Sequence, residues 1–217
     1  MKKVLFIAVV IFMSITAGQA QSVYFPSQEG MTLEYADKNA KGKVTGYVTY
    51  KIQKIERQDD ANFTVSYLVS SSDNKRNETM SPMEITVKVI NGSVYFDGTS
   101  VMATLASGME IKGNGIIIPS NVKAGQKLDD FSISIEALAT TTSCTNVTVV
   151  ANEKLTTEAG TFDTFKVNMD MSGKVLFVKM QGSISQWYAK GIGEVKTINY
   201  DKKGKILTIR ELSLIRN

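Results

Sequence analysis

Apolar and polar residues alternate along most of this 217-residue chain. In one run, Phe63, Val65, Tyr67 and Val69 occupy the odd positions and alternate with the polar residues Thr64, Ser66 and Ser70. Because successive side chains of a strand point to opposite faces, this alternation indicates strands with one buried face and one solvated face. Such strands are typical of antiparallel sheets, since parallel strands are usually buried on both faces.

The same period of two recurs in four further runs, at residues 44–52, 83–89, 131–135 and 165–171. Turn signals separate the runs, and Asn91-Gly92 is the strongest of them because this dipeptide favours a two-residue hairpin turn. Strands of this kind with short turns predict an all-β antiparallel fold. We expect a large curved sheet or a partly open barrel.

Two segments depart from the strand pattern. In residues 101–109, Val101, Met102, Leu105, Ala106 and Met109 follow helical spacing, three and four apart, which predicts one short helix. A helix of this length is stable only if its apolar face packs against the sheet. Residues 139–145 are small or threonine and suggest a loop or an edge strand.

The first twenty residues have the features of a secretory signal peptide. Lys2 and Lys3 precede a mostly apolar run at residues 4–17, and Gly18-Gln19-Ala20 supplies small residues for cleavage. Residues 21–217 are then expected to form a single antiparallel β domain. No other stretch is long enough and apolar enough to predict a transmembrane segment. Because the only cysteine is Cys144, the exported chain is not expected to be an N-terminal lipoprotein.

Composition excludes several functional classes. The chain contains no histidine and one cysteine, so Ser-His-Asp triads, Cys-His dyads and internal disulfides cannot form. Removal of Lys2 and Lys3 lowers the formal net charge from +4 to +2, which argues against a nucleic-acid partner. No pair of carboxylates is marked as a glycosidase pair. We therefore expect no enzyme, no catalytic residue, no metal and no cofactor.

Methionines and one aromatic pair are the candidate contact residues. Met169 and Met171 share one strand face, where thioethers could bind copper(I) but more simply fill a core or line an apolar pocket. Trp187 and Tyr188 are neighbours on a predicted strand and should face opposite sides. At most one of them is expected in the core, which leaves the other at a surface where it could stack on a sugar or a lipid.

The C-terminal part of the chain carries a recognisable set of motifs. Residues 153–163 read EKLTTEAGTFD, residues 187–196 read WYAKGIGEVK, and residues 200–205 read YDKKGK ahead of Glu211-Leu212. In these motifs the chain resembles the DUF3108-like family of exported bacterial proteins. The resemblance covers about residues 115–215 and implies a large curved antiparallel sheet. It implies no catalytic residue, because the motif residues shape turns and strands.

Three functional hypotheses follow. In the first, an exported, non-enzymatic envelope protein binds a lipid, another apolar ligand or an acylated partner in the concavity of its sheet. The curved sheets of the family are similar in shape to half-barrels that carry lipoproteins between bacterial membranes, although likeness of fold is weak evidence of function. The candidate pocket or surface-contact residues are Met102, Leu105, Met109, Met169, Met171, Trp187 and Tyr188.

The second hypothesis is a structural or protein-interaction module of the bacterial envelope, with no small-molecule ligand, that meets another envelope protein at a strand edge. The third is a glycan-binding or carbohydrate-active protein. In each case the expected location is the periplasm or the periphery of the outer membrane, or outside the cell after secretion. The sequence leaves the ligand, the partner and the oligomeric state open.

Overall fold

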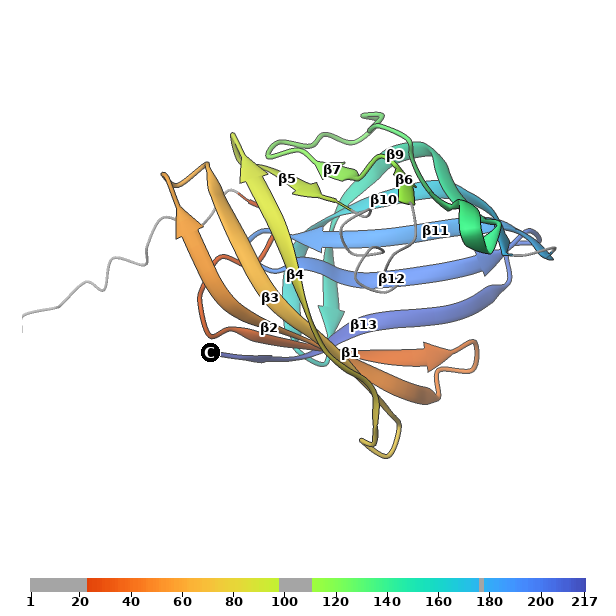
Figure 1. Cartoon of the computed structure of the whole chain (residues 1–217), viewed down its shortest axis with the longest axis horizontal. Helices are drawn as coiled ribbons and strands as arrows, with labels where there is room; N and C mark the ends of the chain where they lie inside the picture. The colour runs from red at the N-terminus through yellow and green to blue at the C-terminus, as the bar shows by residue number, and fades with distance from the viewer. Residues whose placement is uncertain (1–22, 98–110, 176–177) are drawn as a thin grey trace, which may run out of the picture.

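The computed structural model describes residues 23–97, 111–175 and 178–217, most of which lie in β-strands (Figure 1). In these residues one short 3-10 turn, η1 (Glu136–Leu138), is the only helical element. The strands are β1 (Thr32–Asn39), β2 (Val44–Arg57), β3 (Phe63–Asp73), β4 (Glu78–Ile90), β5 (Ser93–Phe96), β6 (Ile111–Gly113), β7 (Ile116–Ile118), β8 (Phe131–Ile135), β9 (Thr140–Thr157), β10 (Gly160–Val175), β11 (Val178–Ala189), β12 (Gly193–Asp201) and β13 (Ile206–Arg216).

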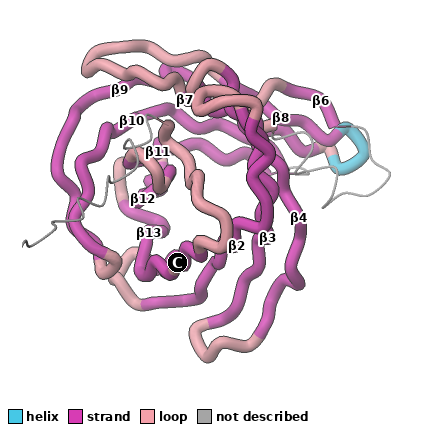
Figure 2. Tube along the Cα trace, turned by 90° about the vertical axis from the view of Figure 1, so that its left-hand side faces the viewer, coloured by secondary structure: helices cyan, strands magenta, loops and turns pink. Residues whose placement is uncertain are grey.

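All thirteen strands belong to one antiparallel sheet, in the order β6-β8-β9-β10-β11-β12-β13-β1-β2-β3-β4-β5-β7. The sheet curves around its own interior without closing into a barrel, as the end-on view in Figure 2 shows. The period-two pattern explains this arrangement: Phe63, Val65, Tyr67 and Val69 of β3 are buried, and the intervening residues are partly exposed. The predicted all-β antiparallel fold with a large curved sheet is confirmed.

The helix predicted at residues 101–109 lies outside the described residues. The same holds for three of the candidate contact residues, Met102, Leu105 and Met109. Among the described residues, no helix has both the length and the apolar character needed to cross a bilayer.

The first and last strands meet in the middle of the sheet. β1 pairs with β13, and in this ladder Tyr35 lies opposite Leu212 and Asp37 lies opposite Arg210. Tyr35 and Leu212 are fully buried, so this central pair of strands contributes directly to the core. Two halves of the chain, β1 to β5 and β8 to β12, are therefore joined through the C-terminal strand.

The two edges of the sheet are linked by one short stretch of chain. β6 pairs with β8 at one edge, β7 pairs with β5 at the other, and only Asn114-Gly115 separates β6 from β7. Gly113 at the end of β6 and Gly115 in this stretch both lie close to backbone atoms of neighbouring strands or loops. A Cβ on Gly113 would lie 2.0 Å from the Ser132 carbonyl oxygen, and a Cβ on Gly115 would lie 2.1 Å from that of Phe96.

The segment that precedes β1 packs inside the curved sheet. The ring of Tyr24 lies 4.5 Å from that of Phe165, and the ring of Phe25 lies 5.7 Å from that of Tyr67. The Gly191 amide donates a 2.8 Å hydrogen bond to the Val23 carbonyl oxygen. This segment fills the end of the interior near the β11–β12 turn with aromatic side chains.

The close packing of the Asn114-Gly115 link between the two sheet edges can be tested with the substitution Gly115→Ala. We expect it to lower the free energy of unfolding by more than about 2 kcal/mol, because the new Cβ can be accommodated only if backbone moves. The matched control is Gly42→Ala, at a φ of +76° with no atom within 4 Å of the Cβ, which should cost about 1 kcal/mol. Urea denaturation measures the free energy of unfolding of both variants. Equal losses would show that the backbone around Gly115 is not closely packed.

Candidate binding site in the concavity

Two charged residues stand on the concave face at the centre of the sheet. Asp37 follows Tyr35 by two residues on β1, and Arg210 precedes Leu212 by two on β13, so both share the face of the buried core. Arg210 Nε and Nη2 donate hydrogen bonds to Asp37 Oδ1 and Oδ2, at 2.7 and 2.9 Å. Burial lowers the pKa of Arg210, but the hydrogen bonds and charge of Asp37 outweigh burial and raise it overall. The guanidinium is always charged.

A carboxyl group lies beside this ion pair. Glu194 Oε2 accepts a 3.0 Å hydrogen bond from Gln186 Nε2, and Gln186 Oε1 accepts a 2.9 Å bond from the Tyr188 hydroxyl. The Tyr35 hydroxyl donates to the backbone oxygen of Glu194 at 2.9 Å. Burial raises the pKa of Glu194; the nearby Thr197 hydroxyl, the hydrogen bond from Gln186 and the charge of Arg210 oppose this only in part. A carboxyl group whose pKa is shifted by burial next to a charged partner is a frequent mark of a functional site.

Local backbone geometry brings Glu194 to the interior. The ladder between β11 and β12 shifts register after Trp187, so Trp187 pairs with Lys196 but Tyr188 pairs with Glu194. Such a bulge adds one residue to a strand and redirects a side chain. Gly193 begins β12 at a φ of +90°, a conformation that glycine adopts without strain. The glycines of the predicted motif therefore position the carboxyl group of the next residue.

These polar residues line an open groove of about 440 Å³. Its walls come from the β1–β2 end and from β11, β12 and β13. The lining residues are Asp37, Lys38, Thr45, Gln186, Glu194, Thr197, Asn199, Thr208, Ile209 and Arg210. The groove therefore offers hydrogen-bond donors and acceptors together with the fixed positive charge of Arg210.

An apolar row continues from the groove across the same face. Asn199 of the groove pairs with Ile184 of β11, and Ile184 pairs with Met169 of β10. Met169 is buried in the core, and Ile184 and Met171 are partly buried against it. The two methionines singled out in the sequence thus lie on the concave face, and Met171 remains partly accessible.

Trp187 and Tyr188 face opposite sides of the sheet, as their adjacency requires. Tyr188 points into the core, where its ring stacks on that of Phe165 with 5.2 Å between centroids. Trp187 is on the convex face, yet only 6% of it is exposed. Its Nε1 donates a 2.5 Å hydrogen bond to Glu153 Oε1, and the Lys166 ammonium lies 4.7 Å from the centroid of its ring. Trp187 is thus not available as an exposed stacking surface.

A chain of ion pairs lies on the same convex side. Lys38 pairs with Glu211 and also with Glu158, at 3.3 Å, and Glu211 pairs with Lys196 at 3.2 Å. Burial raises the pKa of Glu211, but hydrogen bonds from Lys38 and Lys196 outweigh burial and lower it overall. Glu158 belongs to the β9–β10 turn, so the tip of this hairpin folds over the outer face of β13 and β1. These motif residues have a structural role.

The described residues contain no group of three or more acidic or cysteine side chains arranged to hold a metal. Cys144 is buried, and burial raises the pKa of its thiol to about 11. The thiol is therefore protonated near neutral pH and unreactive, as its lack of an activating histidine suggested.

Sequence reasoning missed the four residues that define the groove, Asp37, Gln186, Glu194 and Arg210. A signal was present for two of them. Asp37 and Arg210 each stand two residues from a buried apolar residue, at positions where the strand pattern calls for an apolar side chain. Glu194 gave no such signal, because the bulge after Trp187 changes which face it occupies.

We expect Glu194 to make stability depend on pH. Its pKa is raised in the folded state, so the folded chain holds a proton that the unfolded chain releases above its ordinary pKa of 4.5. The wild type should lose stability as pH rises from 4.5 through the raised pKa, and Glu194→Gln should remove this loss. Urea denaturation across this range, with the exposed Glu84→Gln as control, measures the effect. Parallel profiles of the wild type and Glu194→Gln would contradict it.

The bond between Glu153 and Trp187 can be tested separately. Glu153→Ala should lower the free energy of unfolding by about 1–3 kcal/mol, because it leaves a buried indole N–H without its partner. Trp187 is the only tryptophan, so its fluorescence follows unfolding directly. In the control Asp163→Ala, the exposed ion pair with Lys154 on the same hairpin is lost and stability should hardly change. A similar loss in both variants would argue against the role given to Glu153.

Solved structures resemble this fold closely. A "putative exported protein with YmcC-like fold" from Bacteroides fragilis NCTC 9343 superimposes with a TM-score of 0.75 at 19% identity, covering 90% of this chain and 99% of its own. A "putative lipoprotein" from Parabacteroides distasonis ATCC 8503 superimposes with a TM-score of 0.74 at 19% identity, covering 89% of this chain and 98% of its own. At this identity the likeness concerns the fold alone.

None of the curated proteins matches the chain. The DUF3108-like family matches residues 28–212. The match includes the groove, the bulge at Glu194 and the motifs around Trp187, and extends through the first half, where the sequence motifs alone gave no match. This chain belongs to the DUF3108-like family.

Proposed function

We propose that this protein is a non-enzymatic binding protein of the bacterial envelope that holds a small amphiphilic molecule, such as a lipid, in the concavity of its sheet. The observation that carries the proposal is the division of the concave face. The groove around Asp37, Glu194 and Arg210 is polar, and the adjoining row of Ile184, Met169 and Met171 is apolar.

The division fits a ligand with two parts. Ionised and amide side chains in the groove can hydrogen-bond a polar head group, with Arg210 as the strongest donor. An acyl chain can lie along the apolar row, where partly buried methionine adapts to irregular shapes. The fold of the exported and lipoprotein-like relatives supports a place in the envelope.

The alternative is an interaction module that meets an envelope protein at a sheet edge. It is less favoured, because the two edge strands, β6 and β7, have only three residues each and lie against the chain that joins them. The glycan-binding alternative is also less favoured, because Trp187 is covered.

The proposal is tested by mass spectrometry of organic extracts from protein purified without detergent from its native envelope. We expect an amphiphile in near-equal amount to the wild-type protein. Arg210→Gln should lower its retention at least about ten-fold, because a hydrogen bond to a charged group is lost. The control is Arg76→Gln, which removes a bidentate arginine–carboxylate pair with Glu34, on the opposite face of β1 from Asp37.

Two outcomes would contradict the proposal. A wild-type extract free of amphiphile would make the interaction module the better explanation. Equal retention by Arg210→Gln and Arg76→Gln would show that the ligand does not contact the groove. Circular dichroism of both variants establishes that they are folded.

A further inference from the structure

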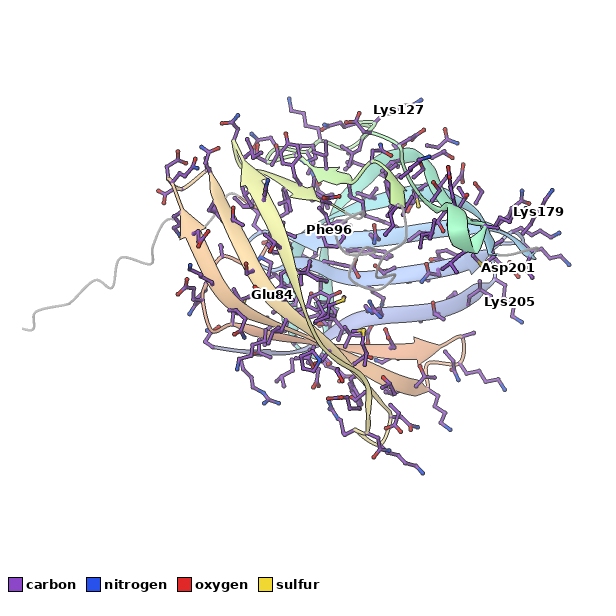
Figure 3. All side chains as sticks on the ribbon, in the orientation of Figure 1. Glu84, Phe96, Lys127, Lys179, Asp201 and Lys205 are labelled. Atoms are coloured by element: carbon purple, nitrogen blue, oxygen red, sulfur yellow. The ribbon has the colours of Figure 1, made fainter. Side chains whose placement is uncertain are left out.

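One end of the molecule combines exposed apolar side chains with a concentration of lysines. The C-terminal end of β10, the start of β11 and the β12–β13 turn lie together there, since Val175 of β10 pairs with Val178 and Gly182 of β11 pairs with Asp201 of β12. Figure 3 shows Lys179, Asp201 and Lys205 at this end, away from Lys127. We name this surface the basic tip and define it by Lys174, Lys179, Lys202, Lys203, Lys205, Val178, Met180 and Leu207.

Three apolar residues of the basic tip are exposed well beyond what strand packing requires. The exposed fraction is 67% for Val178, 38% for Met180 and 48% for Leu207. Val178 is the most exposed large apolar residue described in the chain. A group of exposed apolar residues rimmed by polar ones marks a surface that contacts a partner or a membrane.

The lysines of the basic tip outnumber the acidic residues near them, and the charge of Asp201 acts on Lys202 and Lys205 without forming a salt bridge. None of the five forms a salt bridge with a described residue. Lys174 and Lys179 stand directly opposite each other in the β10–β11 ladder, an arrangement that costs stability in water. Asp201, the acidic residue in the β12–β13 turn, uses its Oδ1 to accept hydrogen bonds from the amides of Lys203 and Lys205. An external anionic surface would offset this concentration of positive charge.

We propose that the basic tip docks on an anionic lipid membrane, with Val178, Met180 and Leu207 entering the interface and the lysines contacting lipid phosphates. Apolar side chains flanked by lysines suit this environment, because the chains bury in the acyl boundary and the ammonium groups stay at head-group level. The proposal does not depend on a ligand in the groove. The groove nevertheless lies next to the basic tip, because Asn199 and Thr208 of the groove flank the β12–β13 turn.

The first test uses the wild-type mature chain and flotation with lipid vesicles. Vesicles of phosphatidylcholine mixed with phosphatidylglycerol should bind the protein, and vesicles of phosphatidylcholine alone should bind much less. Raising the salt concentration should weaken binding, because exposed charges are screened. Equal binding to both vesicle types, or binding that salt leaves unchanged, would overturn the proposal.

Variants then separate the basic tip from the rest of the surface. Each lysine near an anionic surface strengthens partitioning roughly five-fold, so replacing Lys202, Lys203 and Lys205 by serine should weaken it about a hundred-fold. The control replaces Lys51, Lys88 and Lys127 by serine, which removes the same charge from exposed positions elsewhere. Val178→Ser should weaken binding about ten-fold, whereas Ile90→Ser, at the exposed end of β4, should not. Equal effects of the two triple variants would overturn the proposal.

Lysine footprinting on the wild type keeps the proposal testable if a variant fails to fold. Anionic vesicles should slow the acetylation of Lys179, Lys202 and Lys203 and leave Lys51 and Lys127 unchanged. Uniform or absent protection would overturn the proposal. Protection by an acidic envelope protein without any protection by vesicles would replace the membrane with a protein partner.

Discussion

A single sheet with one apolar face, and with only one 3-10 turn beside it among the described residues, removes that face from water by curving around it. Every strand here presents alternate residues to the inside, and the two ends of the sheet are brought together by residues 111–118. The core, the position of the segment before β1 and the concave groove all depend on this curvature. Burial of apolar surface is the dominant favourable term in folding. The two residues Asn114-Gly115, which link the sheet edges, therefore help to keep the whole core buried.

Much of the fold could be predicted from the sequence, because a period of two is visible in single strands. Asn91-Gly92 forms the predicted hairpin turn, with positive φ at both residues and Ile90 paired with Ser93. The threonine-rich residues 139–145 were expected to form a loop or an edge strand, but most of them lie in β9, which is paired on both sides. Threonine suits a solvated strand face as well as it suits a loop, so composition alone did not decide between them.

The candidate site was harder to predict, because it depends on departures from regular pairing. Met169 and Met171 could be placed on one face from their spacing. The approach of Glu194 to Arg210 and Gln186 depends on the register shift after Trp187 and on the pairing of β13 with β1, which are properties of the assembled sheet. The covering of Trp187 by Glu153 and Lys166 likewise follows from the long β9–β10 hairpin and not from local pattern. The WYAKGIGEVK motif thus serves both faces of the sheet at once.

The pairing of β1 with β13 also orders events in time. A chain is made from its N-terminus, so β1 to β5 exist long before β13 does. Until β13 has been made, one edge of β1 is unpaired, and the side chains of Leu33 and Tyr35 lack the neighbouring strand that helps to bury them. Long-range pairing of this kind makes folding slow and leaves strand edges open to wrong partners. The buried surface around Tyr35 is therefore completed only when β13, the last strand to be made, pairs with β1.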